Sequence, residues 1–331
     1  MSEAVVVENL VKKYGGDFEA VKGGVSFKVK RGGEIFAFLG PNGAGKTTTV
    51  HVLTTLLRPT SGRAIVAGHD VVEEPMEVRK RIGIVFQDPS LDRELTAWEN
   101  MYIHGRIYGL KGSELREKIE RLLKFVELWE FKDKPVKTFS GGMQRRLEIA
   151  RSLLHEPEVL FLDEPTIGLD PQTRAHIWDY IRTMKEEHNM TIFLTTHYMD
   201  EAEMLADRIA IIDHGKIIAE GTAEKLKKLV GNDVIYFKLD APEELKCLES
   251  GFIRGCKVLP DGRVALEVEN AAEALPGLFE LANERGIRIL EVTYHRPTLN
   301  DVFLHLTGRE IRDEGPENPM ASFVRMRMRR R

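Results

Sequence analysis

Residues 40–48 read Gly-Pro-Asn-Gly-Ala-Gly-Lys-Thr-Thr and follow directly on an apolar run at 35–39. The three glycines let the backbone curl so that successive N–H groups point at one spot, and a following helix adds the positive end of its dipole. Lys46 supplies a charge for the β- and γ-phosphates, and the hydroxyl of Thr47 can bind Mg²⁺. An ordinary glycine-rich turn does not require a Lys-Thr pair in this register. The segment predicts a site for a nucleoside triphosphate.

Polar residues also follow three other short apolar runs. The runs at 82–86 and 159–162 end in Gln87 and in Asp163-Glu164, and the run at 191–194 leads through two threonines to His197. Runs that are apolar on successive residues are typical of strands buried on both faces. Open α/β sheets bind ligands at the carboxyl ends of their strands. We therefore expect these polar side chains to gather beside the glycine-rich loop.

The elements that must position them alternate short strands with helices over the first ~230 residues, which is typical of a parallel sheet wrapped by helices. The fold class predicted is α/β, with a mostly parallel sheet, antiparallel edge strands at 209–212 and 217–219, and an inserted helical lobe at about 88–155. Lobe helices are expected from Thr96, which begins a capping box with Glu99, at 113–128, and from Ser140.

The pattern changes after Gly231-Asn232-Asp233. Strands predicted at 234–239, 252–258, 264–268 and 287–292 and helices at 242–248 and 271–284 give a βαββαβ order, typical of a small α+β ferredoxin-like domain. A turn at 260–262 and a last helix at 299–306 complete it. The predicted domains are thus 1–230, 231–308 and a basic tail at 309–331.

Composition excludes several classes of protein. No stretch approaches the ~18 apolar residues of a membrane span, and the start Met-Ser-Glu-Ala does not resemble a signal peptide. The net charge of −4 gives no reason to expect nucleic acid as a partner, and the two cysteines, Cys247 and Cys256, are too few for a disulfide framework. These features predict a cytoplasmic protein. The five arginines at 325–331 could meet anionic lipid or nucleic acid, but a solvated chain end is the preferred interpretation.

Ser140-Gly141-Gly142 opens a predicted helix and forms a second candidate anion site, with exposed N–H groups and a hydroxyl. One nucleotide needs only one phosphate-binding site of this kind, which residues 40–48 already provide. A single chain therefore does not explain the second site, or second cradle, at Ser140-Gly141-Gly142. Together with residues 40–48, 160–165 and 168–170, Gln87 and His197, it resembles the ATP-binding subunits of ABC transporters. All these motifs stand in that family's order and spacing, over roughly residues 1–230.

The resemblance implies ATP and Mg²⁺ as ligands and a head-to-tail pair of subunits, a homodimer or a close paralogue, in which Ser140 and Gly142 of one chain cap the γ-phosphate held by Lys46 of the other. It implies that Glu164 is the general base, that His197 contacts the γ-phosphate, and that Asp163 and Gln87 serve the metal. The implied catalytic residues are Lys46, Gln87, Glu164 and His197, and the implied metal ligands are Thr47, Gln87 and Asp163. The implied nucleotide-binding residues are Tyr14, Gly40, Asn42, Gly43, Gly45, Lys46, Thr47, Thr48, Ser140, Gly141, Gly142 and Asp170.

In this resemblance Tyr14 stacks on adenine, Asp170 crosses the dimer interface, and some residues of 88–108 are exposed to contact a separate membrane permease. The subunit would lie on the cytoplasmic face of the membrane. Residues 297–308 are similar to the C-terminal motif of the daunorubicin-resistance type of ABC-2 exporter ATPase, where a small domain stabilises or regulates the dimer. Phe139 and Met143 depart from the usual leucine and glutamine of the helix-opening motif, but both leave the serine and the glycine N–H groups in place.

Three other functions compete with this interpretation. A soluble ABC ATPase that acts on ribosomes or DNA would usually carry two ATPase cores or a long coiled coil, and neither is present. A kinase or GTPase of another phosphate-loop family would not need Ser140-Gly141-Gly142 or His197. A nucleotide-binding regulator without turnover would not need Glu164.

Overall fold

The computed structural model describes residues 3–15, 18–240, 253–259 and 263–307. They form two compact units, one within Met1–Ala223 and the other within Glu224–Glu310. The predicted helix at 242–248, the predicted turn at 260–262, Cys247 and the basic tail lie outside the described residues.

The first unit contains the predicted, mostly parallel sheet. Its six strands have the order β10-β9-β3-β8-β7-β6, and every neighbouring pair is parallel except β9 and β10. The strands are β3 (Ile35–Leu39), β6 (Ile82–Val85), β7 (Val159–Asp163), β8 (Thr191–Thr196), β9 (Arg208–Asp213) and β10 (Lys216–Gly221). Every residue of β3, β7 and β8 is buried, which confirms the interpretation of these three apolar runs as strands covered on both faces, whereas β6 ends at Val85 and its Ile84 is half-buried.

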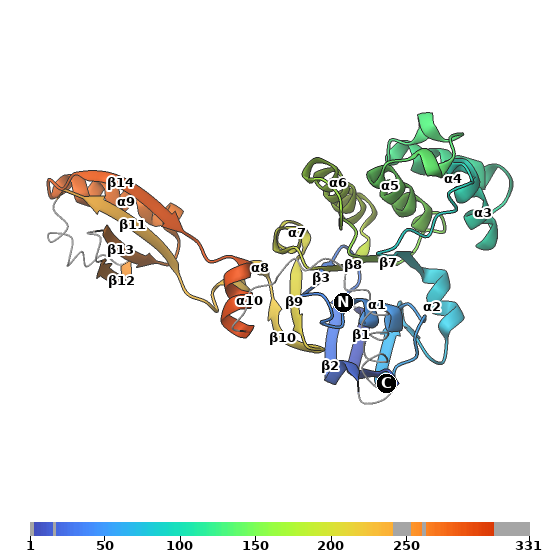
Figure 1. Ribbon diagram of the computed structural model, residues 1–331, viewed down its shortest axis with the longest axis horizontal. Helices are drawn as coiled ribbons and strands as arrows, with labels where there is room; N and C mark the ends of the chain where they lie inside the picture. Colours follow the sequence, from blue (N-terminus) through green and yellow to red (C-terminus); the bar gives the residue numbers. More distant parts are fainter. Residues whose placement is uncertain (1–2, 16–17, 241–252, 260–262, 308–331) are drawn as a thin grey trace, which may run out of the picture. The chain divides into compact units, whose positions relative to one another are not determined.

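A second sheet in this unit was not predicted. It is antiparallel, in the order β2-β1-β4-β5, and comprises β1 (Glu3–Lys13), β2 (Glu19–Lys30), β4 (Ser61–Val66) and β5 (His69–Asp70). Helix α1 (Lys46–Leu53) contacts β2 and β4 of this sheet and β7 of the larger one (Figure 1). Five phenylalanines pack between the sheets, with neighbouring ring centroids 5.3–5.8 Å apart. They are Phe27, Phe36, Phe38, Phe161 and Phe193.

The predicted helical lobe consists of α3 (Ala97–Ile107), α4 (Gly112–Phe125) and α5 (Gly141–Ser152), which contact one another (Figure 1). Thr96 and Glu99 form the predicted capping box at the start of α3. Helix α4 ends three residues before its predicted end, and Glu127 just beyond it has a left-handed φ of 57°. Short 3-10 turns follow at Trp129–Phe131 and Val136–Thr138. Helix α5 contacts β6 and α6 (Pro171–His188), so the lobe is joined to the sheet through α5.

Three further short helices are α2 (Pro75–Arg81), α7 (Met199–Leu205) and α8 (Ala223–Lys227). Helix α7 packs on β3 and β8, directly after the strand end that carries His197. Among the described residues, no helix is both long and apolar enough to cross a membrane.

The second unit has the expected ferredoxin-like sheet, with antiparallel neighbours in the order β12-β13-β11-β14. Its elements are β11 (Asp233–Leu239), β12 (Ile253–Val258), β13 (Arg263–Val268), α9 (Ala271–Glu284), β14 (Ile289–His295) and α10 (Leu299–Thr307). Ala274, Leu278 and Ala282 of α9 lie in one core with the inner face of the sheet. The last strand begins two residues later than predicted and extends to His295.

Candidate functional site

The glycine-rich loop joins β3 to α1, and two of its glycines have no room for a side chain. A Cβ on Gly40 would lie 2.2 Å from the carbonyl oxygen of Ile212, and one on Gly45 would lie 2.4 Å from that of Ala20. Gly45 also has a left-handed φ of 102°. These positions need glycine because any Cβ would collide with backbone, so the loop's tight curl depends on them.

Lys46, at the start of α1, is almost fully buried, with 4% of its surface exposed. Its Nζ donates hydrogen bonds to the carbonyls of Gly40 (2.8 Å) and Pro41 (3.1 Å) and lies 3.0 Å from Oε1 of Glu164. Burial lowers the pKa of Lys46, and the carboxylate of Glu164 opposes that shift. The ammonium group is therefore held inside the curl of the loop, facing the end of β7.

Two carboxylates stand at the end of β7. Asp163 accepts hydrogen bonds from the hydroxyls of Thr195 and of Thr47, the latter at 3.3 Å. Burial raises the pKa of Asp163, while these hydrogen bonds act in the opposite direction. The hydroxyl of Thr47 and the carboxylate of Asp163 thus present oxygen atoms to the same space.

Glu164 follows with a left-handed φ of 48°, and its backbone N–H donates to the carbonyl of Thr195 at 3.1 Å. Its Oε2 lies 3.1 Å from Nδ1 of His197, while Oε1 faces Lys46. Burial alone would raise the pKa of Glu164, but the hydrogen bond with His197 and the charge of Lys46 hold it below its usual value. Glu164 is consequently an ionised carboxylate at neutral pH, a form that can accept a proton.

Gln87 and Tyr14 contact residues outside this cluster. Gln87 follows β6, the neighbour of β7, is half-buried, and its carbonyl accepts a hydrogen bond from Arg145 at 3.0 Å. The hydroxyl of Tyr14 lies 3.4 Å from that of Thr48 on α1, and the tyrosine is half-buried. The structure therefore places Tyr14 beside the helix that begins with Lys46. Asn42 is exposed within the loop.

The residues expected from the second cradle lie on α5 and α6. Ser140 is exposed and caps α5, with its hydroxyl accepting from the N–H of Met143 at 3.2 Å. Gly141 is exposed, whereas Gly142 packs so closely on α6 that a Cβ would lie 2.4 Å from the methyl of Thr173. Asp170 caps α6 by accepting from the N–H (3.0 Å) and hydroxyl (2.6 Å) of the same Thr173.

The structure therefore brings some of the predicted residues together and keeps others apart. Lys46, Thr47, Asp163, Glu164 and His197 form one connected cluster. The side chain of Ser140 bonds its own helix instead, and that of Asp170 bonds α6. Both are exposed, which leaves them accessible to a second chain.

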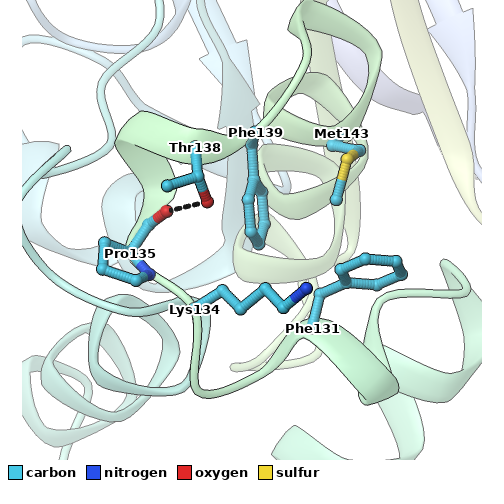
Figure 2. Close-up of a pocket in the computed structure, with 6 residues that line it drawn as sticks. All are labelled: Phe131, Lys134, Pro135, Thr138, Phe139 and Met143. Atoms are coloured by element: carbon cyan, nitrogen blue, oxygen red, sulfur yellow. Dashed lines mark hydrogen bonds between the residues drawn. The ribbon is translucent and has the colours of Figure 1, made fainter.

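Phe139 and Met143 face a hollow of about 320 Å³ beside the start of α5 (Figure 2). Phe131, Lys134, Pro135 and Thr138 line its other sides. The ring of Phe139 meets that of Phe131 edge to face, with centroids 6.5 Å apart. The two departures from the usual motif thus line this hollow and leave the Ser140 cap of α5 intact.

Two contributors to the site were missed from the sequence. Thr195 bonds both Asp163 and the backbone of Glu164, and the pair of threonines before His197 was the available signal. Glu201 is fully buried on α7 and accepts hydrogen bonds from the hydroxyl of Thr166 (2.7 Å) and from the indole of Trp178 (3.0 Å). Burial raises its pKa. Glu201 links the segment after Glu164 to the helix after His197. A single glutamate in the sequence does not indicate such a contact.

The oxygen atoms of this site suit a magnesium ion that is bound together with substrate phosphates, rather than a metal ion bound by protein side chains alone. Among the described residues, no group of three or more His, Cys, Asp or Glu side chains could hold a metal ion. Magnesium retains several waters and binds through one or two protein oxygens together with substrate phosphates. Thr47 and Asp163, with Gln87 at the end of the next strand, offer that kind of donor set.

Comparison with known proteins agrees with this geometry. The family profile described as ABC transporter matches residues 23–167, and the profile described as ATP-binding protein DrrA1-3-like, C-terminal domain, matches residues 221–307. The chain is 45% identical to the daunorubicin resistance ATP-binding protein DrrA3 of Streptomyces coeruleorubidus, over 93% of this chain and 97% of that one. It is 41% identical to the Nod factor export ATP-binding protein I of Ralstonia nicotianae, over 93% and 94% respectively.

A solved structure with the same fold is a dimeric ATP-binding cassette in a post-hydrolysis state, bound to ADP and Pi. It matches with a TM-score of 0.61 and 30% identity, over 66% of this chain and 98% of that chain.

Proposed function

The chain belongs to the ATP-binding subunits of ABC transporters, the ATPases that power transport, and we propose that it works as one of a pair that closes on two MgATP molecules. The observation that carries the proposal is the buried cluster in which Glu164 lies between Lys46 and His197. An ion pair between Lys46 and Glu164 with only a structural role would not need His197, which comes from the end of a neighbouring strand, on the second oxygen of Glu164.

In the proposed reaction, Lys46 binds the β- and γ-phosphates of ATP, and Glu164 accepts a proton from the attacking water. The water oxygen bonds to the γ-phosphorus, the bond from that phosphorus to its bridging oxygen breaks, and ADP leaves with the bridging oxygen. His197 holds Glu164 through the 3.1 Å contact to Oε2, so the other oxygen is free to face the water once Lys46 turns to phosphate. Magnesium, held by Thr47, Asp163 and Gln87, would neutralise charge on the phosphates.

We assign the second cradle to the nucleotide of a partner chain. Ser140 is exposed at the N-terminus of α5, where free N–H groups and the helix dipole attract anions. Asp170, exposed at the start of α6, would meet the loop of that partner. Lys46 of one copy and Ser140 of the other would then complete each site.

The direction of transport that we propose is export. The two relatives compared above carry names for drug resistance and for Nod factor export, and both align with more than nine-tenths of this chain. The match to the DrrA-like C-terminal profile extends the likeness beyond the ATPase core.

We further propose that α3 meets a separate membrane permease at the cytoplasmic face of the membrane. Tyr102, Ile103 and Ile107 are exposed on this helix, Ile107 to 75%. An exposed apolar cluster on a surface helix is typical of an interaction site. Ile103→Asp/Ile107→Asp should abolish co-purification with the permease and leave ATP turnover of the free subunit unchanged. Met204→Asp, which changes an exposed residue of α7, is the control.

The decisive experiment for the ATPase site is Glu164→Gln. We expect turnover to fall by about 10²–10⁴-fold, because the amide accepts no proton, while ATP still binds and holds a dimer that light scattering detects. Glu158→Gln is the matched control, because Glu158 is partly exposed and pairs with Arg31 and Arg81 at the surface. Wild-type turnover in the Glu164 variant would refute the assignment.

A further inference from the structure

Helix α5 carries three charged side chains spaced three residues apart, Arg145, Glu148 and Arg151, which lie along one side of the helix. All three bond the segment 86–90 that follows β6 and contains Gln87. Ser140 caps the start of the same helix, so one element connects the segment around Gln87 to the second cradle.

Arg145 holds the first half of this segment. Its guanidinium donates to the carbonyls of Phe86 (2.5 Å) and Gln87 (3.0 Å) and also to Oε2 of Glu148 (3.1 Å). A planar guanidinium can satisfy two neighbouring carbonyls and a carboxylate together, whereas a lysine ammonium acts as a point charge. The backbone of Gln87 is therefore fixed to α5 from within the protein.

Glu148 and Arg151 hold the second half. Oε1 of Glu148 accepts from the backbone N–H (2.7 Å) and the hydroxyl (3.3 Å) of Ser90. Arg151 donates to the carbonyl of Ser90 at 2.9 Å and to its hydroxyl. Peptide groups on both sides of Asp88 and Pro89 are thus bonded to one face of α5.

Removing the charges of Arg145 and Glu148 from water costs free energy, so stability alone does not explain this ion pair. Arg145 and Glu148 are 6% and 1% exposed, and a buried ion pair usually stabilises a protein no more than apolar residues of similar volume would. The charged pair contributes hydrogen bonds that fix the peptide groups of residues 86–90 in place, which apolar side chains cannot do. The functional reason must then lie in where the segment stands.

We propose that Arg145 and Glu148 are positioning residues that make the segment around Gln87 and the cradle at Ser140 move as one body. The proposal rests on the function proposed above, in which Gln87 serves the metal and water of one nucleotide and Ser140 caps the other. Neither Arg145 nor Glu148 contacts Lys46, Glu164 or His197 in the described contacts; both act through Gln87 and α5.

The test is the double variant Arg145→Met/Glu148→Met, which removes both members of the buried ion pair together. We expect a melting temperature close to that of the wild type, ATP affinity within about threefold, and kcat lowered by about 10–100-fold, as for a catalytic group displaced from a distance. Hydrogen exchange at the amide of Ser90 should accelerate. Arg146→Met is the control: Arg146 is the next residue on α5 and bonds the carbonyl of Val126 and Glu127 within the lobe. It should keep the wild-type kcat.

Arg145→Lys gives a second measurement if the double variant does not fold. It keeps the charge beside Glu148 but cannot span both carbonyls, so kcat should fall with unchanged ATP affinity. Wild-type kcat in a folded double variant, or in Arg145→Lys, would overturn the proposal, as would a loss of kcat matched by an equal loss in ATP affinity. A wild-type protein without ATP turnover would instead refute the proposed function, so the two failures are distinguishable.

Discussion

In the proposed reaction, Glu164 serves two states of the site. Its carboxylate has Lys46 on one oxygen and His197 on the other, so each oxygen has one partner. Phosphate would compete with Glu164 for Lys46, whereas His197 can keep its own contact throughout. In the reaction proposed above, exchange at Lys46 would release the oxygen of Glu164 that faces the attacking water.

Tyr14 allows a prediction about the base. The ring lies beside α1 and its hydroxyl is 3.4 Å from Thr48, where it could stack on an adenine above the loop. Tyr14→Ala should weaken ATP binding by about 1–3 kcal/mol, and GTP binding by a similar amount, because stacking tolerates any base. Titration calorimetry measures both. Tyr14→Phe retains the ring and should bind ATP nearly as the wild type does; equal affinity in the alanine variant would remove Tyr14 from the site.

The residues that could be predicted from sequence are those whose role shows in local spacing. Lys46 and Thr47 stand at fixed distances from the glycines, and Asp163, Glu164 and His197 stand at the ends of apolar runs. Thr195, Glu201 and the pair Arg145–Glu148 act through contacts between segments more than 20 residues apart, such as Glu201 with Thr166 and Trp178. Only the three-dimensional fold establishes such contacts.

At the scale of elements, the start of α3 has a separable contribution to stability. Thr96 accepts from the N–H of Glu99 at 3.1 Å, and Glu99 accepts from the N–H of Thr96 at 2.8 Å. Thr96→Ala should reduce the free energy of unfolding by about 1 kcal/mol and leave ATP affinity unchanged. Urea unfolding followed by tryptophan fluorescence measures it. Ser113→Ala, at an exposed position of α4, is the control, and equal losses in the two variants would contradict the capping role.

The contact of α3 with the end of α5 predicts a pH dependence. Burial, with Arg151 and His155 nearby, lowers the pKa of His104 to about 4, and its Nε2 has no hydrogen-bond partner among the described residues. The unfolded chain binds this proton near pH 6.5 and the folded chain near pH 4, so stability must fall as the pH drops between these values.

From pH 7 to pH 5 the expected loss from His104 is about 1–2 kcal/mol. His104→Phe keeps an aromatic ring against Tyr108, whose ring centroid lies 5.0 Å away, and removes the titrating group. Urea unfolding at the two pH values should therefore show a smaller loss of stability in the variant than in the wild type. Equal losses would place the titration elsewhere.

The elements themselves were predictable to different extents. The parallel strands were found because consecutive apolar residues signal burial on both faces. The antiparallel sheet was missed although Val25, Phe27 and Val29 alternate with exposed residues along β2. That alternation is short, because Gly23 and Gly24 both have left-handed φ values and the register between β1 and β2 shifts repeatedly. Irregular pairing of this kind weakens the period-two pattern on which a strand prediction depends.

At the scale of the whole molecule, the proposed site belongs to two chains. A head-to-tail pair related by a two-fold axis contains two equivalent sites, each with Lys46 from one copy and Ser140 from the other. This division can be tested by placing two inactivating changes either on different chains or on the same chain. Lys46→Ala should remove phosphate binding, and Ser140→Arg should block the partner's γ-phosphate with a bulky side chain.

A heterodimer of a Lys46→Ala chain with a Ser140→Arg chain should recover ATP turnover that neither variant has alone. One of its sites carries both changes, but the other combines an intact Lys46 with an intact Ser140, so about half of the wild-type turnover is expected if the sites act independently. Two different affinity tags isolate the mixed dimer, and phosphate release measures its rate.

The matched control pairs a wild-type chain with a chain that carries both changes. In a shared site this dimer has one defect in each site and should be inactive, although it contains a complete wild-type chain. If each chain instead held its own complete site, the outcomes would be reversed, with turnover in the control and none in the first heterodimer. The comparison therefore tests the shared site directly, because both dimers contain the same two substitutions and differ only in which chain carries them.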